Sequence, residues 1–313
     1  MFDYDPRDRS EDTRDSIDVH WVKLGRGPAD EDPRDPHDTR DRDRGSRDRD
    51  PRDPFVATLE LPRGLDREVV VDGRHRYELN GDDVRTLGAI GAFRVVAEND
   101  LRDAGDDSRD PDLRHLRDEG LVRSVPLDGH ERGVTLTERG QHLLDSHRAD
   151  RGGEREQGFY AGVNRARELS HDAQLYRAYL REEERLRETG GDVRRVVLDH
   201  ELKREYQDWL QEHNRGRADS DGRSDRDPRD IEEWAREHEL PYFDESVHFP
   251  DFRIEYTVNG LERHQDVEVV TPHYRGAHAA GVARSGFSCY GRSGVSRGRG
   301  GRAFDPRVAE EFF

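Results

Sequence analysis

The chain has 313 residues, of which 40% are charged and 31% hydrophobic, and acidic residues outnumber basic ones by 71 to 53. So little apolar material cannot fill one packed core along the whole length, and part of the chain is therefore expected to be unfolded. A single cysteine, Cys289, excludes a disulfide framework or a cysteine-based zinc site. No apolar run reaches the roughly 18 to 20 residues of a membrane helix, so we expect a cytoplasmic protein without a membrane partner.

The net charge of −18 argues weakly against nucleic acid as a partner. Lys23 and Lys203 are the only lysines, so almost every cation is an arginine, which is a strong partner for phosphate. Aspartate and arginine alternate along much of the chain, where their charges cancel locally. Net charge therefore neither predicts nor excludes DNA binding.

The first 54 residues form a mixed-charge, proline-broken tract, with Asp-Pro-Arg-Asp repeats at 32–35 and 50–53. Such a tract cannot bury enough surface to offset its ordering entropy, and we expect residues 1–54 to be a disordered tail. Residues 55–79 are expected to be a short β region. A strand is predicted at 55–61, and strands at 68–71 and 74–79 flank a predicted Asp72-Gly73 turn.

Residues 80–148 have the element order of a winged helix-turn-helix. Helices are predicted at 82–92, 98–104 and 111–119, a hairpin at 121–125 and 134–137, and a helix capped by Thr137 after it. Such a domain either contacts DNA or a protein, or only holds another domain. In a DNA-binding version the third helix enters the major groove. The candidate DNA-binding cations are then Arg109, Arg114, Arg117 and Arg132, although Asp112, Asp118 and Glu119 on the same helix oppose phosphate.

After a linker at 149–164, residues 165–290 alternate between helix and strand patterns. A helix is predicted at 169–189, with Glu182 to Glu184 on its outer side. A strand at 193–198 and a helix at 202–210 follow. Residues 213–230 are expected to be a flexible insertion before a helix at 231–239. A flexible, Gly/Arg-rich tail is expected at 291–313.

Asn259-Gly260 is a strong hairpin signal, and a two-residue turn there defines the whole register. Val258 then pairs with Leu261, Glu255 with His264, Arg253 with Asp266, and Asp251 with Glu268. Two carboxylates in directly opposite positions repel each other. Either a divalent cation such as Mg²⁺ offsets that repulsion, or the face is solvated and relieved by the neighbouring pairs.

Pro250-Asp251 opens this hairpin, and Asp266-Val267-Glu268 ends its return strand, after a helix, a strand and a helical insertion. This order resembles the PD-(D/E)xK nuclease core. Together with the winged helix and the Leu169-Ser170-His171-Asp172 run, residues 79–290 resemble the replication-relaxation family, which is associated with plasmids and mobile elements. The resemblance implies an α+β fold, with a winged helix-turn-helix followed by a mixed α/β restriction-endonuclease-like domain.

The resemblance also implies a site. Asp251 and Glu268 would be catalytic metal ligands for Mg²⁺ or Mn²⁺, with Asp266 as an alternate ligand. The position of the usual nuclease lysine holds Val270, and Arg284 on the next helix would supply a catalytic cation. Arginine stays protonated and can stabilise phosphate charge, but it cannot act as a base.

Two functions follow. The first is a DNA-binding protein of plasmid or mobile-element replication or mobilisation, with DNA and replication or mobilisation proteins as partners and a nuclease-like site that uses the metal if active. The alternative is a non-enzymatic winged-helix transcriptional regulator whose second domain is an inactive nuclease-like assembly module.

Overall fold

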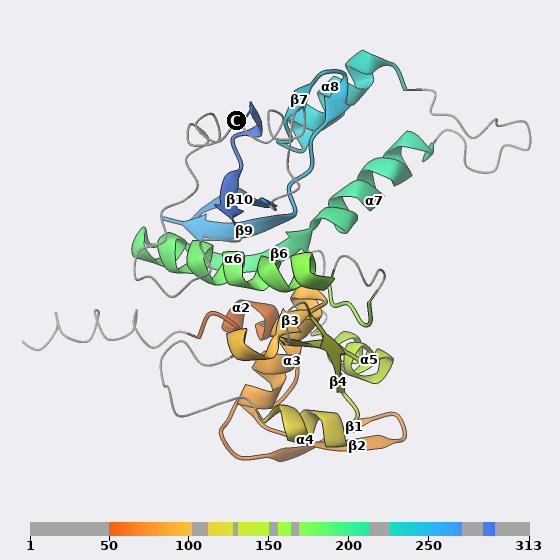
Figure 1. Cartoon of the computed structure of the whole chain (residues 1–313), viewed down its shortest axis with the longest axis vertical. Coiled ribbons are helices and arrows are strands. Elements are labelled where there is room, and N and C mark those ends of the chain that lie inside the picture. The colour runs from red at the N-terminus through yellow and green to blue at the C-terminus, as the bar shows by residue number, and fades with distance from the viewer. Residues whose placement is uncertain are drawn as a thin grey trace, which may run out of the picture. The chain divides into compact units, whose positions relative to one another are not determined.

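The computed structural model describes residues 50–101, 112–127, 131–149, 156–163, 169–212, 226–270 and 284–291, all within one compact unit of the chain. They form a mixed α+β fold (Figure 1). Residues 1–49 of the expected tail, Arg109, most of the expected insertion at 213–230 and residues 292–313 lie outside the described residues. Within the described ranges, no helix combines the length and apolar character that a bilayer crossing requires.

The first helix, α2 (Asp53–Val56), corrects the predicted strand at 55–61. Pro54 stands in its first turn, where a missing N–H has no cost. Phe55 and Val56 are both buried, which an alternating strand with one solvent face would not allow. The ring of Phe55 packs against Phe93 and Tyr179, so contacts with distant helices override the local strand preference. α2 also begins inside the segment expected to be tail.

Strands β1 (Glu68–Asp72) and β2 (His75–Leu79) form the predicted antiparallel hairpin. Asp72 pairs with His75, so the turn residues are Gly73 and Arg74, one position later than predicted. Gly73 adopts a φ of +58°, which glycine tolerates at the first position of such a turn. Asp72 is therefore free to point inward, where its carboxylate accepts a hydrogen bond from the Ser146 hydroxyl at 3.1 Å.

Three helices and three strands follow the hairpin: α3 (Gly81–Phe93), β3 (Val96–Ala97), α4 (Leu113–Asp118), β4 (Val122–Pro126), β5 (Arg132–Leu136) and α5 (Glu138–Ser146). The predicted helix at 98–104 is present only as a 3-10 turn, η1 (Glu98–Asp100), in its described part. The strands form an antiparallel sheet in the order β3-β5-β4, and sequence patterns did not indicate β3. Thr137 caps α5 as predicted, by accepting a hydrogen bond from the Gly140 N–H.

The remaining elements include a four-stranded sheet, a separate β7–β8 hairpin and one long helix. In chain order they are α6 (Leu169–Glu188), β6 (Asp192–Leu198), α7 (Asp199–Leu210), α8 (Pro228–Glu237), β7 (Tyr242–Phe243), β8 (Ser246–Val247), β9 (Phe252–Val258), β10 (Leu261–Val270) and β11 (Ser288–Gly291). The strand order is β11-β10-β9-β6, and only the β10–β11 pair is parallel. α6 packs on the apolar face of this sheet (Figure 1). Its buried tyrosines join one core with α3, since the Phe93 ring contacts both Tyr176 and Phe252.

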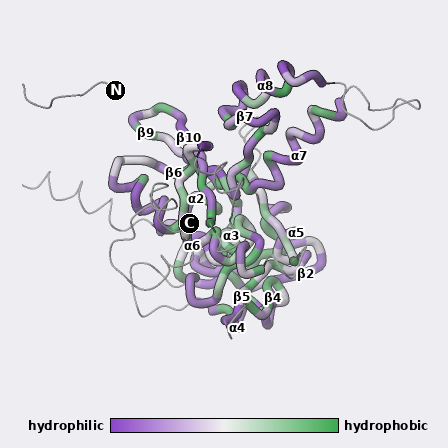
Figure 2. The backbone as a smooth tube through the Cα atoms, turned by 45° about the horizontal axis from the view of Figure 1, so that its top comes forward, coloured by the Kyte–Doolittle hydropathy of each residue, from purple (hydrophilic) through white to green (hydrophobic). Residues whose placement is uncertain are grey.

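Glu182 and Glu183 are buried, so their predicted place on the outer side of α6 is wrong. Glu182 is one turn from the buried Tyr179 and Leu186 and therefore faces the sheet. Its carboxylate accepts hydrogen bonds from the Tyr290 hydroxyl on β11 and from Arg185. The hydrogen bond from Tyr290 on β11 thus offsets part of the cost of burying the Glu182 carboxylate. By contrast, α7 and α8 are largely hydrophilic along their length (Figure 2).

Candidate functional site

The β9–β10 hairpin confirms the predicted register. Asn259 and Gly260 both have positive φ, at 52° and 75°, as a type I′ turn requires. Val258 pairs with Leu261, Glu255 with His264, and Arg253 with Asp266. The ladder ends at the pair of Phe252 and Val267, immediately before Asp251 and Glu268. The Asp251 backbone N–H donates to Glu268 Oε2 at 3.2 Å, so the two residues meet as expected.

The Asp251 carboxylate is held by donors of the protein itself. Its Oδ2 accepts a hydrogen bond from the Val269 N–H at 2.7 Å. His171 Nε2, from the first turn of α6, lies 3.2 Å from the same oxygen. Asp172 stands on the other side of the ring, 3.8 Å from Nδ1. His171 therefore lies between two carboxylates.

This placement makes His171 a cation. Burial lowers the pKa of its imidazole, but the hydrogen bond to Asp251 and the negative charges of Asp172 and Asp251 outweigh burial and raise the pKa to about 10. The opposite holds for Cys289, which pairs with Glu268 across β10 and β11. Burial and the nearby Glu268 and Asp251 raise the pKa of its thiol to about 11, so the thiol stays neutral. The positive charge next to Asp251 is thus an imidazolium.

Asp266, the alternate ligand, is engaged elsewhere. Arg253 binds its carboxylate through two hydrogen bonds of 2.7 and 2.9 Å, and each side chain is only 9% exposed. The guanidinium also donates to the carbonyls of His238 and Glu239 at the end of α8. Asp266 therefore belongs to a buried ion pair that ties α8 to the sheet.

Arg284 reaches a different part of the molecule from the carboxylate pair. Its guanidinium donates to Asp244 Oδ2 at 3.0 Å, and it stacks on the ring of Phe243 at 4.3 Å. Both partners belong to the β7–β8 hairpin. The structure thus does not bring this cation to Asp251 and Glu268.

These contacts do not fit the metal centre that the resemblance implies. The His171 ring and a backbone N–H already contact the Asp251 carboxylate, and Arg253 binds Asp266. Within the described ranges, no three His, Cys, Asp or Glu side chains are grouped so that they could hold a metal ion. Val270 continues β10 at the position of the usual lysine. The carboxylate pair is therefore best described as a clamp that joins α6 to the sheet.

Arg94 extends the polar cluster toward α3. It follows α3 with a φ of 65° and a ψ of −49°, and Val95 N–H donates to the Phe93 carbonyl at 2.6 Å across it. This is a γ-turn in a strained backbone region. The guanidinium lies 3.7 Å from Asp172 and donates to His200 Nδ1 at 3.2 Å. Burial and this neighbouring cation lower the pKa of His200 to about 4.

The predicted DNA-binding arginines differ in exposure and in ion pairing. Arg114 on α4 is 91% exposed, and its nearest acid, Asp118, is 3.9 Å away. Arg117 is held by Glu98, which also accepts a hydrogen bond from Ser124. Arg132 is exposed at the start of β5. Arg114 and Arg132 are thus available to a phosphate backbone, whereas Arg117 would first have to leave Glu98.

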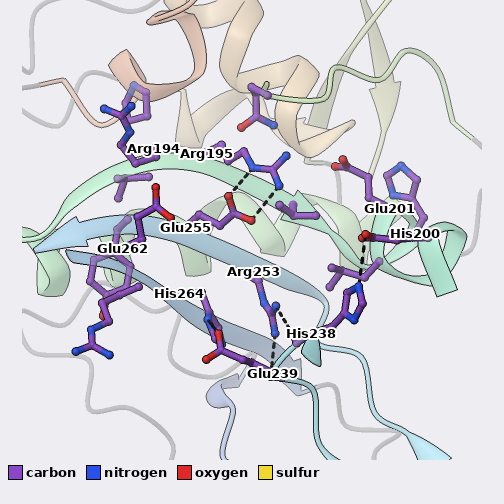
Figure 3. A pocket seen from close by; sticks show the side chains of 18 of the residues that line it. Arg194, Arg195, His200, Glu201, His238, Glu239, Arg253, Glu255, Glu262 and His264 are labelled. Carbon is purple, nitrogen blue, oxygen red and sulfur yellow. Dashed lines mark hydrogen bonds and ion pairs between the residues drawn. The ribbon is translucent and has the colours of Figure 1, made fainter. Parts of the chain in front are cut away.

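A polar cleft of about 1090 Å³ lies over β6, β9 and β10 (Figure 3), and no sequence pattern indicated it. Its floor holds two buried arginines, Arg195 and Arg253, each paired with a carboxylate of the sheet. His238 and Glu239 close one side, and His200 and Glu201 lie at another (Figure 3). The pairing of Arg195 with Glu255 needed the β6–β9 register, which no local pattern specifies.

Comparison of the chain with protein-family models, with curated proteins and with solved structures finds no match.

Proposed function

We propose that this chain is a DNA-binding protein of plasmid or mobile-element replication or mobilisation. In this proposal a winged helix contacts the duplex, and a nuclease-like domain without catalytic activity serves as an assembly module. The carrying observation is the strand order β3-β5-β4, with α3 and α4 before the β4–β5 hairpin. In a winged helix, the short strand that follows the first helix pairs with the second strand of the wing, as β3 pairs with β5 here.

The topology of the second part supports a nuclease-like core. A long helix precedes three antiparallel strands, and a fourth strand pairs in parallel with the third. Asp251 and Glu268 stand at the strand positions that the nuclease pattern assigns to carboxylates. The loss of catalysis is inferred from their contacts, because His171 and the Val269 N–H hold Asp251 and Val270 replaces the lysine.

The test uses the full-length protein with supercoiled and single-stranded DNA in the presence of Mg²⁺ or Mn²⁺. We expect a gel shift without cleavage. Asp251→Asn and Glu268→Gln keep the shape of each side chain and are expected to retain the shift. Arg114→Ala with Arg132→Ala should weaken binding and flatten its salt dependence, because two phosphate contacts are lost.

Arg229→Ala on α8 is the matched control, since Arg229 is also exposed but lies outside the winged helix. Equal binding by all variants would contradict the assignment of α4 and the wing to DNA. Cleavage by the parent and by neither carboxylate variant would instead establish the metal-dependent nuclease and overturn the assembly role.

A further inference from the structure

The β1–β2 hairpin is attached to α4, the helix assigned to DNA. Arg67, just before β1, donates to Asp112 Oδ2 at 2.9 Å, and Asp112 caps α4. His115 Nε2 lies 2.6 Å from the Glu78 carbonyl oxygen of β2. Val70, Tyr77 and Leu79 bury the inner face of the hairpin in the core. The hairpin is therefore attached both to α4 and to the core.

The outer, solvent-exposed face of the hairpin carries two valines among its charged residues. Val69 and Val71 are 60% and 55% exposed, and they lie opposite Glu78 and Arg76 in the register. Alternation would place polar side chains at these two positions if the face met only water. Val69 and Val71 thus give this charged face an apolar component.

The charges are arranged along the ribbon. Arg74 in the turn and Arg76 on β2 are exposed, and no ion pair joins either of them to another described residue. Asp72, which precedes the turn, points inward and is 8% exposed. Glu68 and Glu78 stand at the opposite end, where the ribbon joins the body. A chain with a net charge of −18 therefore presents a positive tip on a ribbon whose root contacts α4 and whose turn end contacts α5 through Asp72 and Ser146.

We propose that the β1–β2 hairpin is a second DNA-contacting element, with Arg74 and Arg76 at the phosphates and Val69 and Val71 against base edges. The major groove of B-DNA admits a two-stranded ribbon as well as a helix. Valine methyl groups suit the thymine methyl, which is the apolar feature of that groove. Because Glu68 and Glu78 are at the root and Arg74 and Arg76 are near the turn, the turn end of the ribbon is the end attracted to the phosphate backbone. This inference rests on the proposed function, and it extends the DNA surface beyond α4 and the wing.

The test measures the affinity of the full-length protein for a fluorescent duplex of about three helical turns at several salt concentrations. Arg74→Ala/Arg76→Ala should weaken binding severalfold and reduce the slope of log K against log salt by about two. Arg229→Ala/Arg236→Ala on α8 is the control and should change neither quantity, since both arginines are exposed there. Thermal melting of each variant establishes that the fold is intact.

A second arm replaces thymine by uracil in the duplex, which removes only the methyl groups. The parent should bind the uracil duplex more weakly, and Val69→Ala/Val71→Ala should abolish this difference. If the hairpin variants match the parent on every duplex while Arg114→Ala binds more weakly, the hairpin inference fails and the winged-helix proposal stands. If the parent itself binds no duplex, the proposed function fails. A hairpin variant that changes self-association but not DNA affinity would assign the face to a second copy and overturn the inference.

Discussion

The ion pair of Arg253 and Asp266 offers a quantitative test of the structure. Both side chains are 9% exposed, and two hydrogen bonds of 2.7 and 2.9 Å join them. Removing one partner of a buried pair costs about 3 to 5 kcal/mol, because the other charge stays buried without compensation. Arg253 keeps the carbonyls of His238 and Glu239 as acceptors. We therefore expect Asp266→Asn to lower the free energy of unfolding by about 3 kcal/mol, near the low end of that range.

The assay is urea denaturation at pH 7, followed by circular dichroism. Glu255→Gln is the matched control, since Arg195 and Glu255 are paired in the same way but Glu255 is 31% exposed. Solvent screening should limit that loss to about 1 kcal/mol. The double change Arg253→Met/Asp266→Leu should recover part of the stability, because the apolar side chains need no partner although the carbonyls of His238 and Glu239 lose their donor.

An Asp266→Asn loss no larger than that of Glu255→Gln would refute the reasoning. It would show that Arg253 does not depend on the carboxylate. A variant of unchanged stability that loses affinity for Mn²⁺ would return Asp266 to the role of metal ligand.

Three further outcomes are expected. The pKa of His200 is about 4 in the folded protein, below its ordinary value, so its contribution to stability is present above about pH 6.5 and is lost as the pH falls toward 4. The melting temperature of His200→Gln should therefore depend less steeply on pH over that interval than the melting temperature of the parent. Gly140→Ala should destabilise the fold by about 1 to 3 kcal/mol despite the helix preference of alanine, because the new Cβ would lie 2.2 Å from the Leu121 carbonyl oxygen. Denaturant titrations measure this change, and an increase in stability would contradict the close approach. Tyr290→Phe should cost about 1.5 to 3 kcal/mol by removing a donor to the buried Glu182 carboxylate, whereas the exposed Glu184→Gln should leave the unfolding midpoint unchanged.

Most of the features that the sequence determines by itself, such as turns, helix caps and helix periodicity, depend on residues close together in the chain. Asn259-Gly260 specifies a turn whose two residues both need positive φ, and the register up to Arg253 and Asp266 follows from it. Thr137 caps α5, and the hydrophobic spacing of α3 and α6 predicts both helices close to their observed bounds. Each of these features depends on residues a few positions apart, so local chemistry is sufficient.

Only the tertiary structure decided which charges are partners. His171 and Asp251 are 80 positions apart and Glu182 and Tyr290 are 108 apart, and no periodicity relates them. α2 is a helix because Phe55 meets Phe93 and Tyr179, although its own residues favour a strand. The sequence therefore places Asp251 beside Glu268, but whether that pair is a metal site or a clamp depends on which side chain α6 brings to it. A buried carboxylate takes the donor that packing supplies, and packing is a property of the whole fold.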